Sequence, residues 1–97
     1  MDHADVATAF AALSHPARLK AVIKLAAEPK GMAAGVLARE LGIRQNTLSS
    51  HIATLERCGI IYGQREGRYI IYQLNRFMTR SVLEQASHWV RGGAQQG

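Results

Sequence analysis

Apolar residues recur every three or four positions along five stretches of the chain, the spacing that places side chains on one face of an α-helix. The pattern predicts a first helix that ends near Leu13 and four more at about Pro16–Ala26, Ala33–Leu41, Gln45–Cys58 and Arg76–Val90. In the fourth helix, Leu48, Ile52 and Leu55 fall at positions i, i+4 and i+7 and form the expected buried stripe.

A different pattern separates the fourth and fifth predicted helices. Isoleucine and tyrosine are frequent in Ile60–Arg65 and in Arg68–Leu74, and Glu66-Gly67 lies between these runs. Two such runs joined by two residues that include glycine predict a β-hairpin, in which Arg65 and Arg68 are direct neighbours. The expected fold is therefore mainly α with a small β-hairpin (α+β), in the order α-α-α-α-β-β-α.

The connection between the third and fourth predicted helices, Gly42-Ile43-Arg44, is short and contains glycine. Such a connection is typical of a helix-turn-helix motif, whose second helix enters the major groove of DNA.

The length of 97 residues predicts a single domain, 1–97, with flexible ends at 1–4 and 92–97. A hydrophobic content of 47% and a charged content of 20% indicate a folded globule. No apolar run approaches the roughly 18 residues that span a bilayer, and the acidic N-terminus does not resemble a signal peptide. We therefore expect a cytoplasmic protein without a membrane partner.

The net charge of +5 favours an anionic partner, and its distribution narrows the choice. Residues 39–80 contain seven arginines and three glutamates and so carry most of the excess. Arginine binds phosphate or a guanine edge at two points, which makes double-stranded DNA the expected partner.

Three segments resemble the ArsR-type (ArsR/SmtB) winged-helix transcriptional repressors. They are Leu13–Leu19, the stretch from Gln45 to Ile61, and Arg65–Arg68 with Tyr72, and they keep the family's order and spacing over roughly residues 5–90. The resemblance implies a winged helix-turn-helix fold and a homodimeric, DNA-binding transcription repressor. Family members are often released from DNA by a metal, metalloid or redox signal.

The expected DNA-binding residues come from the fourth helix and the hairpin, which would form the wing. Asn46, Ser50 and Arg57 lie opposite the apolar stripe, and His51 lies at its margin, where it either packs or contacts DNA. The full set is Arg44, Gln45, Asn46, Thr47, Ser49, Ser50, His51, Arg57, Arg65 and Arg68.

Arg44 and the Arg65–Arg68 pair each present an electrostatic conflict. Arg44 stands where the family usually has serine, and arginine cannot accept the free N–H groups of a helix start. Either Asn46 caps the helix or a phosphate binds there. The expected Arg65–Arg68 pairing would also be repulsive, and DNA phosphate would relieve that repulsion.

The apolar stripe of the last predicted helix is wider than a small core needs. We therefore expect it to pack with the first helix against a second copy of the chain. The expected dimer-interface residues are Val6, Phe10, Met78, Val82, Leu83, Ala86 and Trp89.

No sensor or cofactor is evident. The single cysteine, Cys58, excludes an intrachain disulfide, and Glu84 with His88 supplies two potential zinc ligands where three or four are needed. We expect no metal site and no cofactor, and the sequence names no inducer.

Two other function classes compete with a DNA-binding regulator. One is a winged-helix module that docks on protein or RNA without reading DNA sequence. The other is an enzyme, and it is disfavoured because the chain has no nucleophile elbow, phosphate-binding loop or catalytic carboxylate pair.

Overall fold

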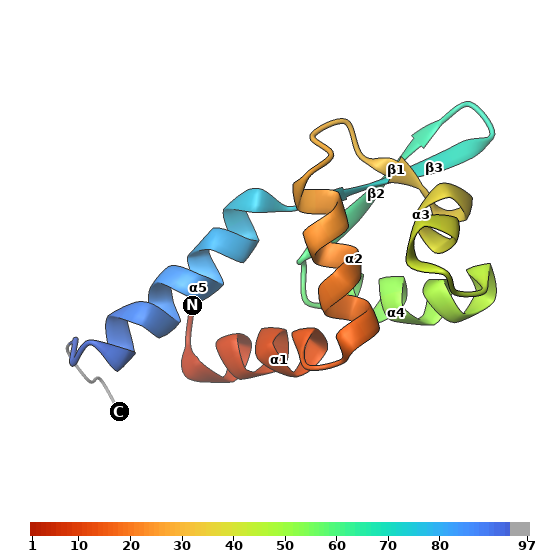
Figure 1. The fold of residues 1–97 in the computed structure, drawn as a ribbon. Coiled ribbons are helices and arrows are strands. Elements are labelled where there is room, and N and C mark those ends of the chain that lie inside the picture. The colour runs from red at the N-terminus through yellow and green to blue at the C-terminus, as the bar shows by residue number, and fades with distance from the viewer. Residues whose placement is uncertain (94–97) are drawn as a thin grey trace.

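Five helices and a three-stranded sheet make up residues 1–93, the part of the chain that the computed structural model describes (Figure 1). In chain order they are α1 (His3–Leu13), α2 (Pro16–Ala26), β1 (Met32–Ala33), α3 (Ala34–Leu41), α4 (Gln45–Arg57), β2 (Ile61–Glu66), β3 (Tyr69–Leu74) and α5 (Arg76–Val90). The expected order of helices and hairpin is confirmed, and the short strand β1 is an addition to it.

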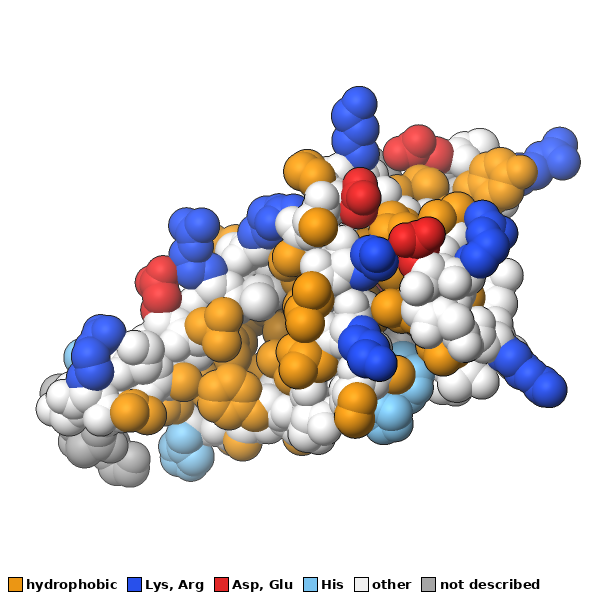
Figure 2. Space-filling model, in the orientation of Figure 1, with side chains coloured by type: hydrophobic (Ala, Val, Ile, Leu, Met, Phe, Trp, Pro, Cys, Tyr) orange, Lys and Arg blue, Asp and Glu red, His pale blue; other side chains and the backbone are white. Residues whose placement is uncertain are grey.

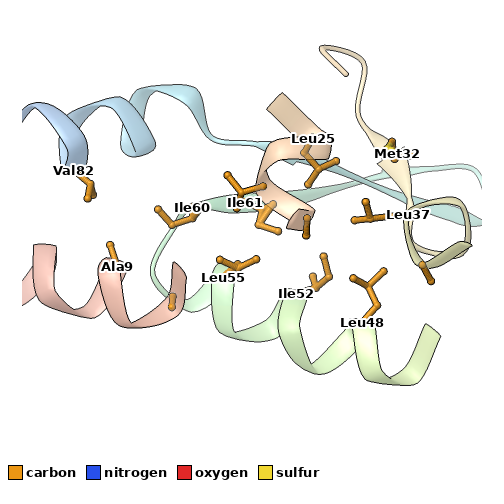
Figure 3. Packing of buried hydrophobic residues seen from close by; sticks show 14 of the residues in the cluster. Ala9, Leu25, Met32, Leu37, Leu48, Ile52, Leu55, Ile60, Ile61 and Val82 are labelled. Carbon is orange, nitrogen blue, oxygen red and sulfur yellow. The ribbon is translucent and has the colours of Figure 1, made fainter. Parts of the chain in front are cut away.

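The main core lies where α4 meets α2, α3 and the sheet. Leu48, Ile52 and Leu55 of α4 are at most 2% exposed, as predicted, and they point toward Leu25 of α2 and Ile61 of β2 (Figure 3). Burying each of these leucine or isoleucine side chains contributes about 1.5–3 kcal/mol of transfer free energy. The apolar stripe therefore fixes which face of α4 remains in contact with solvent.

The ends of the described chain are tied into the helices. His3 and Ala4 are helical, although flexibility was expected there, because Asp2 and Asp5 form a capping box. The Asp5 N–H donates to Asp2 Oδ1 at 2.9 Å and satisfies a free helix-start N–H group. At the other end, Gly92 closes α5 with a φ of 81°. Residues 94–97 of the expected flexible end lie outside the described residues.

The hairpin is shifted by one residue from the predicted frame. Its turn is Gly67-Arg68, so Arg65 pairs with Ile70 and not with Arg68, and the expected repulsion across the strands is wrong. Gly67 has a φ of 62°, and no other residue type in the described chain has a positive φ. This combination is that of a type II′ turn, in which glycine takes the first of the two turn positions.

The sheet has the order β1-β3-β2. Met32 and Ala33 of β1 pair antiparallel with Tyr72 and Ile71 of β3. Because β1 leads directly into α3, this pairing joins the hairpin to the start of the helix-turn-helix. No helix within residues 1–93 has both the length and the apolar character needed to cross a membrane.

Candidate nucleic-acid interface

α4 presents a polar face to solvent because its apolar stripe is turned into the core. Asn46, Ser50 and Arg57, predicted to lie opposite that stripe, are all exposed. Thr47 and Ser49 on the flanks are exposed as well. These side chains are short apart from the arginine, so an approaching nucleic acid can come close to the helix backbone.

The N-terminus of α4 has no side-chain cap. Arg44 is the N-cap residue, with extended φ and ψ of −69° and 147°, and its side chain makes no capping hydrogen bond. Capping by Asn46 was one expected solution, and it is wrong, since α4 begins at Gln45 and no side chain caps its start. The first N–H groups of α4 and the exposed Arg44 guanidinium thus share one end of the helix, an arrangement suited to an anion.

An open groove joins the start of α4 to the hairpin. Gln45 and Ser49 of α4, Arg39 of α3, and Arg68 and Tyr69 of the hairpin all line it, and its volume is about 490 Å³. Residues far apart in the sequence therefore meet on one side of the molecule. Arg68 of the hairpin turn and Ser49 on the flank of the exposed face of α4 thus line the same groove.

Sequence reasoning missed several residues that line this groove. Gly35 lies so near Gln45 that a Cβ added to the glycine would come within 3.3 Å of Gln45 Oε1. Arg39, Tyr69 and Tyr72 line the groove as well. The basic character of residues 39–80 was a signal for Arg39, whereas the others depend on contacts between distant segments, which no local pattern shows.

The arginines of this region form no ion pair with any acid in the described part of the chain. Among residues 1–93 the one ion pair joins Lys24 to Glu40, at 3.1 Å between Nζ and Oε1. Arg44, Arg65 and Arg68 are exposed. Figure 2 shows blue side chains extending into solvent at the end that holds α3, α4 and the hairpin. Such a surface attracts a polyanion.

Arg57 is held close to α4 rather than extended. Its Nη2 donates to Thr54 Oγ1 at 3.2 Å, and the Thr54 hydroxyl in turn donates to the Ser50 carbonyl at 3.3 Å. The guanidinium is therefore directed back along the polar face, where it adds charge beside Ser50.

His51 takes the packing and hydrogen-bonding role. Its half-buried ring accepts a hydrogen bond at Nδ1 from Arg18 Nε at 3.2 Å, and it lies 4.5 Å, centroid to centroid, from the His15 ring. Burial first, and then the charges of His15 and Arg18, lower the pKa of His51 below its ordinary value. A DNA contact by His51 stays a prediction.

The predicted dimer residues fall into two groups. Phe10 and Leu83 are 42% and 52% exposed, and Met78, Ala86 and Trp89 are partly buried and pack against the core. Val6 and Val82 are buried in the chain's own core, so their assignment to an interface is corrected.

Sequence reasoning also missed two exposed residues of α5. Phe77 and Val90 are 82% and 87% exposed, more than any other large apolar side chain of the described chain. Figure 2 shows apolar side chains along the face formed by α1, α2 and α5. An exposed apolar area of this kind marks an interaction surface.

The potential sensor residues occupy two separate places, since Cys58 does not share the hollow that Glu84 and His88 line. Cys58 is partly buried at the end of α4, and its thiol donates to the Leu55 carbonyl at 3.4 Å. Glu84 and His88 line an open hollow on α5 beside Met1. Within residues 1–93, no three His, Cys, Asp or Glu side chains gather to hold a metal ion.

Comparisons with known proteins agree with this geometry. The family described as "Helix-turn-helix domain" matches residues 13–62. The HTH-type transcriptional regulator YgaV of Escherichia coli K12 is 31% identical over 79 residues, covering 81% of this chain and 79% of the relative. The transcriptional regulator NmtR of Mycobacterium tuberculosis is 31% identical over 83 residues, covering 86% of this chain and 68% of the relative.

Solved structures of transcriptional regulators are similar to this chain as well. The transcriptional repressor BigR from Xylella fastidiosa is 30% identical with a TM-score of 0.69, covering 93% of this chain and 88% of BigR. An ArsR-like regulator from Rhodococcus sp. RHA1 is 26% identical with a TM-score of 0.70, covering 92% and 86% of the two chains.

The fold and the exposed face of α4 define a winged helix-turn-helix DNA-binding protein. The chain belongs to the ArsR/SmtB family of transcriptional regulators. Its relatives are named as regulators of transcription, which places it outside the enzymes.

Proposed function

We propose that this chain is a homodimeric repressor that binds an inverted-repeat operator through α4 and the hairpin tip. The groove that Gln45 and Ser49 share with Arg68 is the observation that carries the proposal. A recognition helix and a wing on one side of a domain contact adjacent grooves of one duplex. The relative BigR is itself titled a transcriptional repressor.

The exposed face of α4 is suited to read bases. Asn46 and Gln45 can each form two hydrogen bonds with an adenine edge, and Ser50 can donate or accept. Arg57, directed beside Ser50, can reach a guanine edge or a phosphate. Each good two-point contact discriminates against a wrong base by about 1–3 kcal/mol.

The remaining arginines are suited to hold the backbone. A phosphate at the uncapped start of α4 would be bound by Arg44 and the free N–H groups together. Arg65 and Arg68 are exposed on the hairpin, and neither forms an ion pair with an acid among residues 1–93. Backbone contacts of this type set the position of the protein on DNA without reading its sequence.

A second copy of the chain would cover the exposed apolar side chains of α1 and α5. Leu83 and Val90 lie on one side of α5 by helical spacing, and Phe10 of α1 is exposed as well. A winged helix-turn-helix DNA-binding domain from Mycobacterium bovis with the same fold is titled homodimeric; at 24% identity its likeness shows the fold alone. A two-fold dimer places two α4 helices about 34 Å apart, which is one turn of DNA.

Selection from a random duplex library tests the proposal. We expect enrichment of an inverted repeat with half-sites about one helical turn apart. The selected duplex should bind at least about a thousandfold more tightly than its scrambled version at physiological salt. In a reporter whose promoter overlaps that duplex, the protein should lower transcription.

The competing class makes different predictions in the same experiment. A module that docks on RNA or protein would bind selected and scrambled duplexes equally, with the same salt dependence for both. That outcome would remove the repressor proposal. A selected duplex without symmetry would remove the dimer alone.

A further inference from the structure

Three polar side chains join the first turn of α2 to the middle of α4. His15, Arg18 and His51, here called the corner cluster, lie where the α1–α2 corner packs against the recognition helix. His15 and His51 are far apart in the sequence, and the patterns that predict their two helices do not show that these side chains meet.

Arg18 is the centre of the cluster. Its Nη1 donates to the carbonyl of Ala12, in the last turn of α1, at 3.1 Å. Its Nε donates to Nδ1 of His51 on α4 at 3.2 Å. A single half-buried guanidinium therefore connects α1, α2 and α4, and its planar fork gives these two bonds a fixed relative direction.

Both histidines of the cluster use Nδ1 as an acceptor. His15 is the N-cap of α2, and its Nδ1 accepts from the Ala17 N–H at 3.2 Å. His51 Nδ1 accepts from Arg18. An imidazole that accepts at Nδ1 is neutral and carries its proton on Nε2. The geometry thus requires His51 to be unprotonated at the nitrogen that faces Arg18.

We propose that Arg18 and His51 are positioning residues that hold the recognition helix in its DNA-reading orientation, and that a proton on His51 releases this hold. Protonation at Nδ1 turns the acceptor into a donor that faces the Arg18 donor, so the bond is lost. It also places a second positive charge against the guanidinium, next to the His15 ring at 4.5 Å.

The surroundings of His51 determine the direction of the effect. Of the described residues, His15 and Arg18 are the titratable groups that act on the His51 imidazole, and both disfavour a positive charge on it. Burial acts in the same direction and lowers the pKa of His51. Release therefore takes place on the acid side of about pH 6.5, the ordinary value for histidine.

The inference rests on the proposed function, because its readout is sequence reading. The probes are the duplex selected at pH 7.5 and its scrambled version, and the measurement is the ratio of the two affinities by fluorescence anisotropy. Using the ratio cancels the general gain in DNA attraction that accompanies protonation of any histidine.

The variants distinguish the Arg18–His51 hydrogen bond itself from the protonation of His51. His51→Asn retains an acceptor oxygen near the Nδ1 position and has no proton to gain, whereas His88→Asn removes an exposed histidine of α5 as a matched control. Between pH 7.5 and pH 5.5 we expect the affinity ratio to fall at least about fivefold in the wild type and in His88→Asn, and less than about twofold in His51→Asn. Arg18→Lys, which cannot donate along both directions, should have a low ratio already at pH 7.5.

A measurement without DNA or variants completes the test. Imidazole nitrogen NMR of the intact chain should show His51 as the Nε2–H tautomer at pH 7.5, with its midpoint on the acid side of the ordinary value. A ratio that stays constant with pH in the wild type, or that falls equally in His51→Asn, would overturn the inference alone. A ratio near one in the wild type at pH 7.5 would instead overturn the proposed function together with it.

Discussion

Gly63 of β2 lies directly opposite Tyr72 of β3, and a Cβ on the glycine would come within 3.0 Å of the tyrosine ring. The same Cβ would lie 2.9 Å from Cγ2 of Ile70. The missing side chain therefore leaves space in which the Tyr72 ring packs against the core while also lining the groove beside α4. Burial, followed by the charge of Glu56, raises the pKa of this tyrosine, which agrees with its sheltered position.

Gly63→Ala should lower the free energy of unfolding by about 1–3 kcal/mol, because the methyl group overpacks the hairpin against two side chains. Urea unfolding followed by circular dichroism measures the change. Gly35→Ala is the matched control, since its Cβ meets only the flexible end of Gln45 and alanine favours a helix by up to about 1 kcal/mol over glycine. Equal destabilisation by both substitutions would contradict the close packing at Gly63.

Alanine substitutions on α4 and on the hairpin should have different effects on DNA binding. Asn46→Ala and Ser50→Ala should reduce preference for the selected operator by about 1–3 kcal/mol and leave binding to unrelated duplexes unchanged. Their control is Thr8→Ala on α1, far along the chain from both elements. Loss of affinity for all duplexes alike would assign these two residues to the backbone.

Arg65→Ala or Arg68→Ala should weaken binding to every duplex. Each should lower the slope of log affinity against log salt by about one, because one phosphate contact is lost. Titrations of selected and scrambled duplexes between low and physiological salt measure the slope. An unchanged slope with relaxed base preference would reverse the assignment of the hairpin.

Leu83→Ser should shift the chain toward a monomer, because it removes an exposed apolar side chain from the α1–α5 face without touching the core. Sedimentation equilibrium at micromolar concentration should show twice the chain mass of 10.6 kDa for the wild type and a lower average for the variant. Val36→Ser, at a residue 39% exposed on α3, should remain a dimer. A wild type at the single-chain mass would remove the interface.

Stability should fall as the pH falls below about 6.5. The pKa of His51 is lowered in the folded state, so the unfolded chain binds the proton first and protons favour unfolding. The stabilising contribution is complete above the unfolded pKa and is lost as the pH falls toward the folded one. Urea unfolding at several pH values should show a weaker pH dependence for His51→Asn than for His88→Asn. Identical curves for the two variants would exclude a special role for His51.

The sequence was sufficient to predict the orientation of a helix where the spacing of apolar residues within that helix sets it. The spacing of Leu48, Ile52 and Leu55 correctly predicted the buried face of α4, and with it the exposure of Asn46 and Ser50. A helix has one period, so a few apolar residues orient the whole of it.

The sequence pattern did not predict the features that depend on strand pairing or on contacts between distant segments. The hairpin frame was wrong by one residue, because glycine occurs at either position of a two-residue turn and only the pairing of the strands shows which one it takes. Met32 and Ala33 are too few to show an alternating pattern. The corner cluster depends on two helices whose packing brings His15 against His51, which neither helix encodes alone.

The two residues of β1 pair only with Tyr72 and Ile71, so the wing is three strands wide at its root and two strands wide toward Gly67. A narrow ribbon twists more readily than a wider sheet. We therefore expect deformation to concentrate at the tip, the part of the wing that would meet a bound duplex in the proposed complex. The wing is thus expected to be stiffer at its three-stranded root than in the two-stranded part that begins where β1 ends.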